Sequence, residues 1–298
     1  MRAKSEESAR PRRGRVGEGR RWLVFGLVVL GLLVVSVSGA LVTVSTTDPS
    51  RPGSDQGSAV DPGATPRPSA TPDSVVTRAD GSTVETSAGT IVIRPAAPEG
   101  DVVVYFHGAG QTATTVLDDP ETSALVDSLV RAGYTVASRD AGGNSWGDDS
   151  SVRDYVDLVA DVRPAGPRAH VFFVAESMGA VAAAQVAART DVSAWAAVYP
   201  VCDLASIVDP VLRSQIVAAY GESAPAGRSP VAWPDVPVAT WASPDDTVVD
   251  AEVNGAACTA RVGGDFTSTV GEHGDASNFD AASVLRFFSE HGGLGVTQ

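Results

Sequence analysis

The stretch VFFVAESMGAVAAAQVAAR, residues Val171 to Arg189, joins an apolar, strand-like run to an alanine-rich, helix-like run, with Ser177 at the junction. A strand that turns at once into a helix needs a sharp bend, and the residue at the bend is forced into a strained backbone conformation. Small neighbours relieve the crowding there, and Ala175, Gly179 and Ala180 supply them. The stretch therefore predicts a strand, a tight turn with the Ser177 hydroxyl at its apex, and a helix whose first amides point to the same place. A serine without chemistry at such a junction would instead cap the helix.

The chain on both sides of this stretch alternates strand-like and helix-like runs from Val75 to Gln298, about 224 residues without an internal repeat. Strands are expected at 90–96, 101–108, 134–141, 170–177, 193–201, 236–243 and 259–264, and helices at 121–133, 151–162, 178–189, 210–221, 247–258 and 278–292. This alternation is typical of one α/β domain with a mostly parallel central sheet covered by helices on both faces.

The five residues Ala175-Glu176-Ser177-Met178-Gly179 resemble the G-x-S-x-G elbow of the α/β-hydrolase family, with alanine in the first position. The strand before them and the helix after them are the context that this elbow requires. The resemblance, to bacterial esterases and lipases in particular, covers about three quarters of the chain. It implies an α/β-hydrolase fold and a nucleophilic serine at position 177.

A serine hydroxyl needs a base to take its proton, and the base needs an acid to hold its tautomer. The resemblance implies His273 as the base, because it lies in the glycine-rich loop TVGEHGDASNFD before the closing helix. It implies Asp246 as the acid, because Ser243 to Val249 match the family's Gly-x-x-Asp-x-x-Val with serine for glycine. Asp245 and Asp203, each also near a strand end, remain alternatives.

The segment YFHGAG, at the end of an expected strand, resembles the family's oxyanion loop. By that resemblance the backbone amides of Ala109 and Met178 would bind the oxyanion. His107 would be structural, and Gly108 and Gly110 would let the backbone approach the substrate. These three residues are candidates for the substrate pocket.

Two other segments are expected near the site. Trp146, in the loop 141–149, could form a wall of the pocket or pack beneath a loop. Residues 202–234 occupy the place of the family's lid, but their length allows only one or two helices, which favours an open site.

The charge is unevenly distributed along the chain. Residues 1–21 contain eight Lys and Arg against three Glu, and the remainder contains 14 Lys and Arg against 33 Asp and Glu. A folded region this acidic argues against nucleic acid as a partner, because phosphate binding needs a basic surface.

Residues 22–44 are long and apolar enough to span a bilayer, and no charged residue occurs from Trp22 to Thr47. With the basic arm 1–21 on the cytoplasmic side, the sequence predicts a single-pass membrane anchor and a catalytic domain outside the cell. The alternative is a signal peptide cleaved near Ala40, after the small residue Ser38, which would release a secreted protein. A buried core helix would need partners that the flanking segments do not offer.

Residues 45–74 contain 19 Pro, Gly, Ser and Thr among 30 positions, which predicts a disordered linker before a domain of residues 75–298. The two cysteines of the chain, Cys202 and Cys258, are expected to form a disulfide in an extracytoplasmic domain. In the chain-entropy account, closing a loop of this size adds roughly 4 kcal/mol of stability. No metal site or cofactor is indicated.

The resemblance thus implies a serine hydrolase that cleaves a small-molecule or lipid-like carboxylic ester through an acyl-enzyme. The same site would also suit an amidase, a peptidase or an acyltransferase. A non-catalytic extracytoplasmic binding protein that retains the fold is the contrasting hypothesis.

Overall fold

The computed structural model describes residues 72–163, 169–221, 225–229 and 231–294. They all belong to one compact unit, Gly63–Gln298; the other unit, Met1–Pro62, lies outside the described residues. The predictions for the basic arm, for the membrane anchor or signal peptide, and for nearly all of the linker therefore fall on residues that are not described. Among the helices within the described ranges, none combines the length and the apolar character that crossing a membrane requires.

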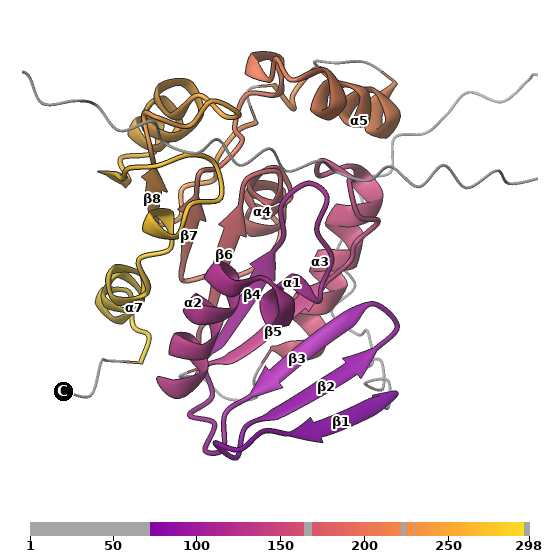
Figure 1. Cartoon of the computed structure of the whole chain (residues 1–298), viewed down its shortest axis with the longest axis vertical. Helices are drawn as coiled ribbons and strands as arrows, with labels where there is room; N and C mark the ends of the chain where they lie inside the picture. Colours follow the sequence, from indigo (N-terminus) through magenta and orange to yellow (C-terminus); the bar gives the residue numbers. More distant parts are fainter. Residues whose placement is uncertain (1–71, 164–168, 222–224, 230, 295–298) are drawn as a thin grey trace, which may run out of the picture. The chain divides into compact units, whose positions relative to one another are not determined.

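A nine-stranded sheet forms the centre of the domain (Figure 1), in the order β1-β2-β3-β5-β4-β6-β7-β8-β9. The strands from β5 to β9 pair in parallel, whereas β1, β2 and β3 add an antiparallel edge. Their bounds are β1 Ser74–Thr77, β2 Thr83–Ser87, β3 Thr90–Arg94, β4 Val102–Phe106, β5 Thr135–Arg139, β6 Val171–Glu176, β7 Ala194–Val198, β8 Val238–Ala242 and β9 Asp265–Ser268.

The helices and helical turns lie between these strands or close the domain. They are α1 Thr115–Asp118, α2 Pro120–Arg131, α3 Asp149–Val162, α4 Gly179–Ala187, η1 Leu204–Ser206, α5 Pro210–Tyr220, η2 Ala251–Ala256, α6 Ala257–Arg261, η3 Ala276–Asn278 and α7 Ala281–Glu290. Several begin at a capping aspartate; the side chain of Asp148, for example, accepts from the Ser151 N–H and starts α3.

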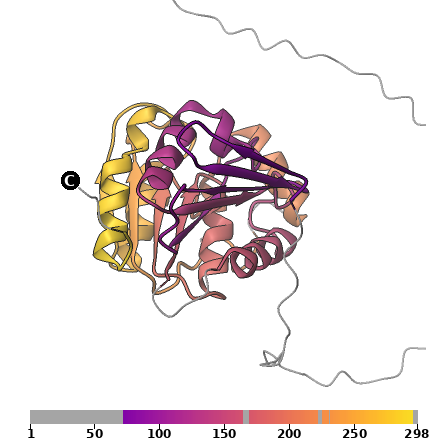
Figure 2. The same cartoon turned by 90° about the horizontal axis from the view of Figure 1, so that it is seen from below.

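Two apolar cores cover the two faces of the sheet, because successive side chains of a strand point to opposite faces. In β4, Val104 and Phe106 pack with α3 and α4, whereas Val103 and Tyr105 pack with α2 and α7. The view from below shows the two layers of helices on opposite sides of the sheet (Figure 2). The expected arrangement, a mostly parallel sheet with helices on both faces, is confirmed.

One part of the expected element order is wrong. The strand expected at 259–264 is the end of α6 and a turn, and the strand that pairs with β8 is β9, which begins six residues after the expected start. All four residues of β9 are exposed, so no apolar run in the sequence indicates this edge strand. The preceding helix begins at Ala251 instead of Thr247 and starts as a π-helix.

In the antiparallel edge, β3 matches the strand expected at 90–96, whereas β1 and β2 were not expected. β1 begins at Ser74, inside the segment assigned to the linker, and its side chains are exposed. A strand without a buried face lacks the alternation on which sequence prediction depends.

Candidate active site

The bend between β6 and α4 holds Ser177 in a left-handed backbone conformation, with φ at +49°. Residues other than glycine rarely adopt this φ, so the conformation persists only where the surrounding structure enforces it. The Ser177 N–H donates to the Val198 carbonyl at 3.0 Å, and the Ser177 carbonyl accepts from the Val201 N–H at 2.9 Å. The expected strained turn with the serine at its apex is confirmed.

The small residues beside the serine allow α4 to approach β4. A Cβ added at Gly179 would lie 2.3 Å from the carbonyl oxygen of Phe106 and 2.8 Å from that of His107. Ala175 and Ala180, on the two sides of the bend, are fully buried. The position after Met178 therefore accepts only glycine, because the contact is with backbone atoms that cannot rotate away.

Gly179→Ala is expected to lower the free energy of unfolding by about 3 kcal/mol, because the new methyl group must displace β4 or the start of α4. Gly255→Ala is the matched control. Its new methyl would lie 2.9 Å from the ring of Phe266, which is 39% exposed and can move, and 3.3 Å from the Cβ of Ala242, so a smaller loss than in Gly179→Ala, about 1 kcal/mol, is expected. Chemical denaturation of both variants measures the difference, and equal losses would contradict this interpretation of the elbow.

Three side chains from distant parts of the chain form a chain of hydrogen bonds at the bend. The Ser177 Oγ lies 3.0 Å from Nε2 of His273, and Nδ1 of the same ring lies 2.7 Å from Oδ2 of Asp246. The Asp246 side chain is 1% exposed and that of His273 is 20% exposed. This order of hydroxyl, imidazole and carboxylate allows a proton to move from the serine to a histidine that a carboxylate orients.

The topology explains why these residues meet. Ser177 follows β6, Asp246 follows β8 and His273 follows β9, and these strands are parallel. Loops at the carboxyl ends of parallel strands lie along one edge of the sheet.

The loops that carry Asp246 and His273 are also held locally. Oδ1 of Asp246 accepts the N–H groups of Val248 and Val249 at 2.8 and 2.9 Å, which fixes the carboxylate that faces His273. The hydroxyl of Thr247 donates to the Glu272 carboxylate at 2.9 Å and ties the two loops together.

The alternative acids lie elsewhere. The Asp245 side chain is exposed, and it does not share the contact that Asp246 makes with the histidine. The carboxylate of Asp203 accepts the N–H of Ala205 and the hydroxyl of Ser229, which places it in the turn of η1.

The other histidines have structural partners. His107 is buried, and its ring nitrogens lie 2.9 Å from the Gly108 carbonyl and 3.1 Å from the Asp140 carbonyl. His170 lies at the start of β6, the opposite end from Ser177, where its ring contacts Asp101. The ring of His291, at the end of α7, packs against Phe287.

The loop after β4 presents one amide without an acceptor. The Gly108 N–H donates to Oε1 of Gln111 and the Gly110 N–H donates to Oδ1 of Asn144, both at 2.6 Å. Within the described part of the chain, the N–H of Ala109 between them makes no hydrogen bond, and neither does that of Met178. Met178 directly follows Ser177, and Ala109 packs against the apolar cluster to which Met178 belongs. Free amides in these two places can bind an oxyanion.

Helix α5 and the turn η1 cover the elbow from above (Figure 1). Leu204 and Ile216 of these elements pack with Met178 and with Trp146, which is fully buried. The indole N–H of Trp146 donates to Gln215 of α5 at 3.3 Å. Of the two interpretations of Trp146, packing beneath a loop is therefore the correct one, and Trp146 is not an exposed wall of a pocket.

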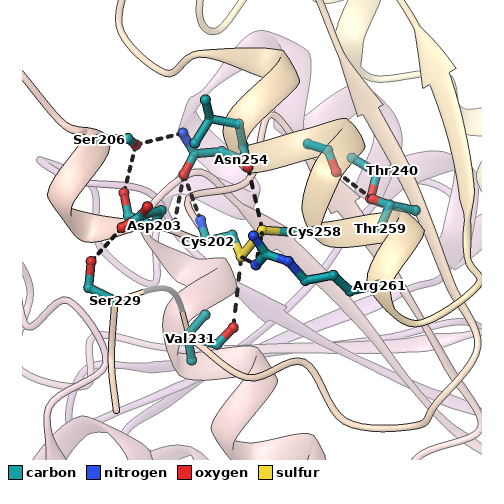
Figure 3. The surroundings of a disulfide bond; sticks show 12 residues. Cys202, Asp203, Ser206, Ser229, Val231, Thr240, Asn254, Cys258, Thr259 and Arg261 are labelled. Atoms are coloured by element: carbon teal, nitrogen blue, oxygen red, sulfur yellow. Dashed lines mark hydrogen bonds between the residues drawn. A yellow bond between two sulfur atoms is a disulfide. The ribbon is translucent and has the colours of Figure 1, made fainter. Parts of the chain in front are cut away.

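The expected disulfide is present between Cys202, after β7, and Cys258 in α6 (Figure 3). Next to it the buried side chain of Asn254 accepts the N–H groups of Cys202 and Asp203, and its amide donates to the Ser206 hydroxyl at 2.9 Å. The disulfide and this asparagine tie the start of segment 202–234 to the helices η2 and α6.

A buried carboxylate directly before Ser177 was not anticipated from the sequence. Glu176 is 4% exposed and accepts hydrogen bonds from the side chains of Tyr105, Tyr199 and Gln111. Burial raises the pKa of the Glu176 carboxyl, and these hydrogen bonds oppose the increase. A signal does exist in the sequence, because Glu176 is the only charged residue in the apolar strand β6.

No family model matches the chain, and no curated protein matches its sequence. Among solved structures, FphF, a fluorophosphonate-binding serine hydrolase of Staphylococcus aureus, is similar with a TM-score of 0.52 and 13% identity over 74% of this chain and 96% of that one.

Two further solved structures are similar. The esterase Pf2001 of Pyrococcus furiosus has a TM-score of 0.51 and 17% identity, over 74% of this chain and 91% of that one. A puromycin hydrolase has a TM-score of 0.50 and 18% identity over 72% of this chain, which spans 39% of that longer protein. At such identities the likeness concerns the fold, and the described domain has the α/β-hydrolase fold.

Proposed function

We propose that this protein is a serine hydrolase that cleaves a carboxylic ester through an acyl-enzyme. The observation that carries the proposal is the continuous line of contacts from the Ser177 hydroxyl through the His273 ring to the buried Asp246 carboxylate, at 3.0 and 2.7 Å. These are hydrogen-bonding distances, short enough for proton transfer without rearrangement of the site.

In the proposed reaction the Ser177 hydroxyl attacks the ester carbonyl while Nε2 of His273 takes its proton. The carbonyl oxygen becomes an oxyanion, and the amides of Ala109 and Met178 stabilise it by about 3 kcal/mol each. His273 then returns the proton to the leaving alcohol, which departs and leaves an acyl group on Ser177. Water, activated by the same histidine, releases the acid and restores the serine.

The side chains near the elbow support an ester with an apolar acyl group. Ala109, Leu212 and Val248 are apolar and only partly buried, and they pack against the buried apolar cluster at the elbow. A small-molecule or lipid-like ester would place its apolar part against such a surface.

Acyl-enzyme kinetics test the proposed reaction. We expect p-nitrophenyl acetate to give a rapid release of nitrophenol in proportion to the amount of protein, followed by slower steady turnover as the acyl-enzyme hydrolyses. Absence of both phases in folded protein would reject the proposal and favour a non-catalytic binding protein. Faster turnover in added alcohol, with ester instead of acid as product, would identify an acyltransferase that uses the same serine.

We also propose that residues 22–44 anchor the protein in the membrane with the domain outside. The apolar segment and the preceding basic arm support this orientation. A disulfide between Cys202 and Cys258 fits an oxidising compartment. Protease treatment of intact cells should remove the domain, and protection from the protease would contradict the orientation. A soluble form cleaved near Ala40 would support the secreted alternative.

A further inference from the structure

Glu176 lies one residue before the candidate nucleophile and collects three hydrogen bonds in the interior. Its Oε1 accepts the Gln111 amide at 2.7 Å and the Tyr199 hydroxyl at 2.8 Å, and its Oε2 accepts the Tyr105 hydroxyl. A buried carboxylate is costly unless it is fully hydrogen-bonded. The reaction proposed above assigns Glu176 no part, so its presence calls for an explanation.

The hydrogen-bond partners indicate that Glu176 acts as an acceptor on every side. Oε1 of Gln111 accepts the Gly108 N–H at 2.6 Å, so the amide nitrogen of Gln111 must face the glutamate. Burial raises the pKa of the Tyr105 and Tyr199 hydroxyls, which therefore stay protonated and donate. Three donors around one carboxyl group favour its ionised form.

The first branch of this network leads to the oxyanion loop. Glu176 accepts a hydrogen bond from the side-chain amide of Gln111. Oε1 of Gln111 in turn accepts the N–H of Gly108, the residue immediately before Ala109. Asn144 fixes the N–H of Gly110 on the other side. The direction of the Ala109 amide thus depends on the glutamate through two hydrogen bonds.

The second branch leads to the histidine. Glu176 accepts a hydrogen bond from the hydroxyl of Tyr199. The Tyr199 ring lies against the His273 ring, with centroids 4.3 Å apart and an interplanar angle of 54°. Phe279 contacts the same tyrosine ring at 5.6 Å. An aromatic ring this close fixes the orientation of the imidazole and also attracts the imidazolium that forms when the serine loses its proton.

We propose that Glu176 is a positioning residue that aligns the Ala109 amide through Gln111 and the His273 ring through Tyr199. This inference rests on the proposed function, because it assigns these groups to one reaction. A single carboxylate next to the elbow would then set the position of the Ala109 amide relative to the His273 ring. Such alignment acts on the transition state more than on substrate binding.

Steady-state hydrolysis of p-nitrophenyl acetate by the full chain in detergent tests the proposal. Glu176→Gln should lower kcat on the order of 10- to 100-fold and leave KM within about twofold, because a displacement of about 1 Å in the reacting groups has this effect. Gln111→Ala and Tyr199→Phe, which each interrupt one branch, should lower kcat by less. The double variant of Glu176→Gln and Gln111→Ala should be no slower than Glu176→Gln alone, because both changes interrupt the same branch.

Asp101→Asn is the matched control. Asp101 is also 4% exposed, and it accepts the His170 N–H at 2.9 Å, but it lies at the opposite end of the sheet from Ser177. This variant should lose stability and keep its kcat per folded molecule. A purely structural role for Glu176 would make the two variants behave alike.

The outcomes distinguish a failure of the positioning role of Glu176 from a failure of the proposed hydrolase function. An active wild type with a folded Glu176→Gln variant that keeps its kcat within about twofold would overturn the positioning role and leave the proposed function intact. A folded wild type without turnover would reject the proposed function and this inference together. If Glu176→Gln does not fold, the half-buried Gln111 decides, and an unchanged kcat in Gln111→Ala would overturn the branch to the oxyanion loop.

Discussion

Ser177→Ala is expected to lower the turnover of an activated ester by about 10⁴-fold or more, because no other group can form the acyl-enzyme at the elbow. The fold should be unaffected, since alanine is smaller and the backbone hydrogen bonds of Ser177 remain. Initial rates with p-nitrophenyl acetate, corrected for spontaneous hydrolysis, measure the loss.

Ser138→Ala is the control for this substitution. Ser138 is fully buried in β5, and its hydroxyl has no hydrogen-bond partner among the described residues, so its removal should leave the rate unchanged. Equal rates for wild type and Ser177→Ala would mean that the hydrolysis comes from another site or from a contaminant.

Asp246→Asn is expected to lower kcat by about 10⁴-fold, because the amide that replaces the carboxylate favours the wrong tautomer of His273. The buried Asp246 side chain accepts the Nδ1 proton at 2.7 Å, and an amide nitrogen at that place cannot accept it.

Asp245→Asn changes the neighbouring, exposed carboxylate in the same way and should leave kcat within about twofold of wild type. The ratio of the two rates decides between the residues that the sequence pattern left as alternatives. A larger loss in Asp245→Asn than in Asp246→Asn would contradict the geometry of the acid loop.

The elements near the elbow could be predicted from the sequence because their physical requirements are strict. The bend at Ser177 needs small residues, and Gly179 lies against the backbone of β4 where no Cβ fits. The resemblance to the α/β-hydrolase family implied His273 and Asp246 as base and acid, and these two side chains do form the hydrogen-bonded line with Ser177. Such constraints leave a clear trace in sequence.

Other features left little trace. β9 is a polar edge strand, so its start was expected six residues too early, at the end of α6. Trp146 is aromatic and lies in a loop near the site, but whether it lines a pocket or packs beneath α5 depends on tertiary contacts.

The hydrogen bonds around Glu176 could not be predicted from the sequence for a different reason. Its partners Tyr105, Gln111 and Tyr199 lie 71, 65 and 23 residues away, and no local spacing connects them. What the sequence does contain is a single acidic residue at the end of an apolar strand. A charged residue in such a place is a reason to look for buried donors around it.

The proposed hydrolysis requires the Ser177 hydroxyl to be the nucleophile. The most direct measurement is mass spectrometry of the protein after reaction with a fluorophosphonate, followed by peptide mapping of the covalent adduct. One adduct per chain on the peptide that contains Ser177, absent in His273→Ala, is the expected result. A folded wild type that stays unmodified, or an adduct on a different residue, would contradict the claim.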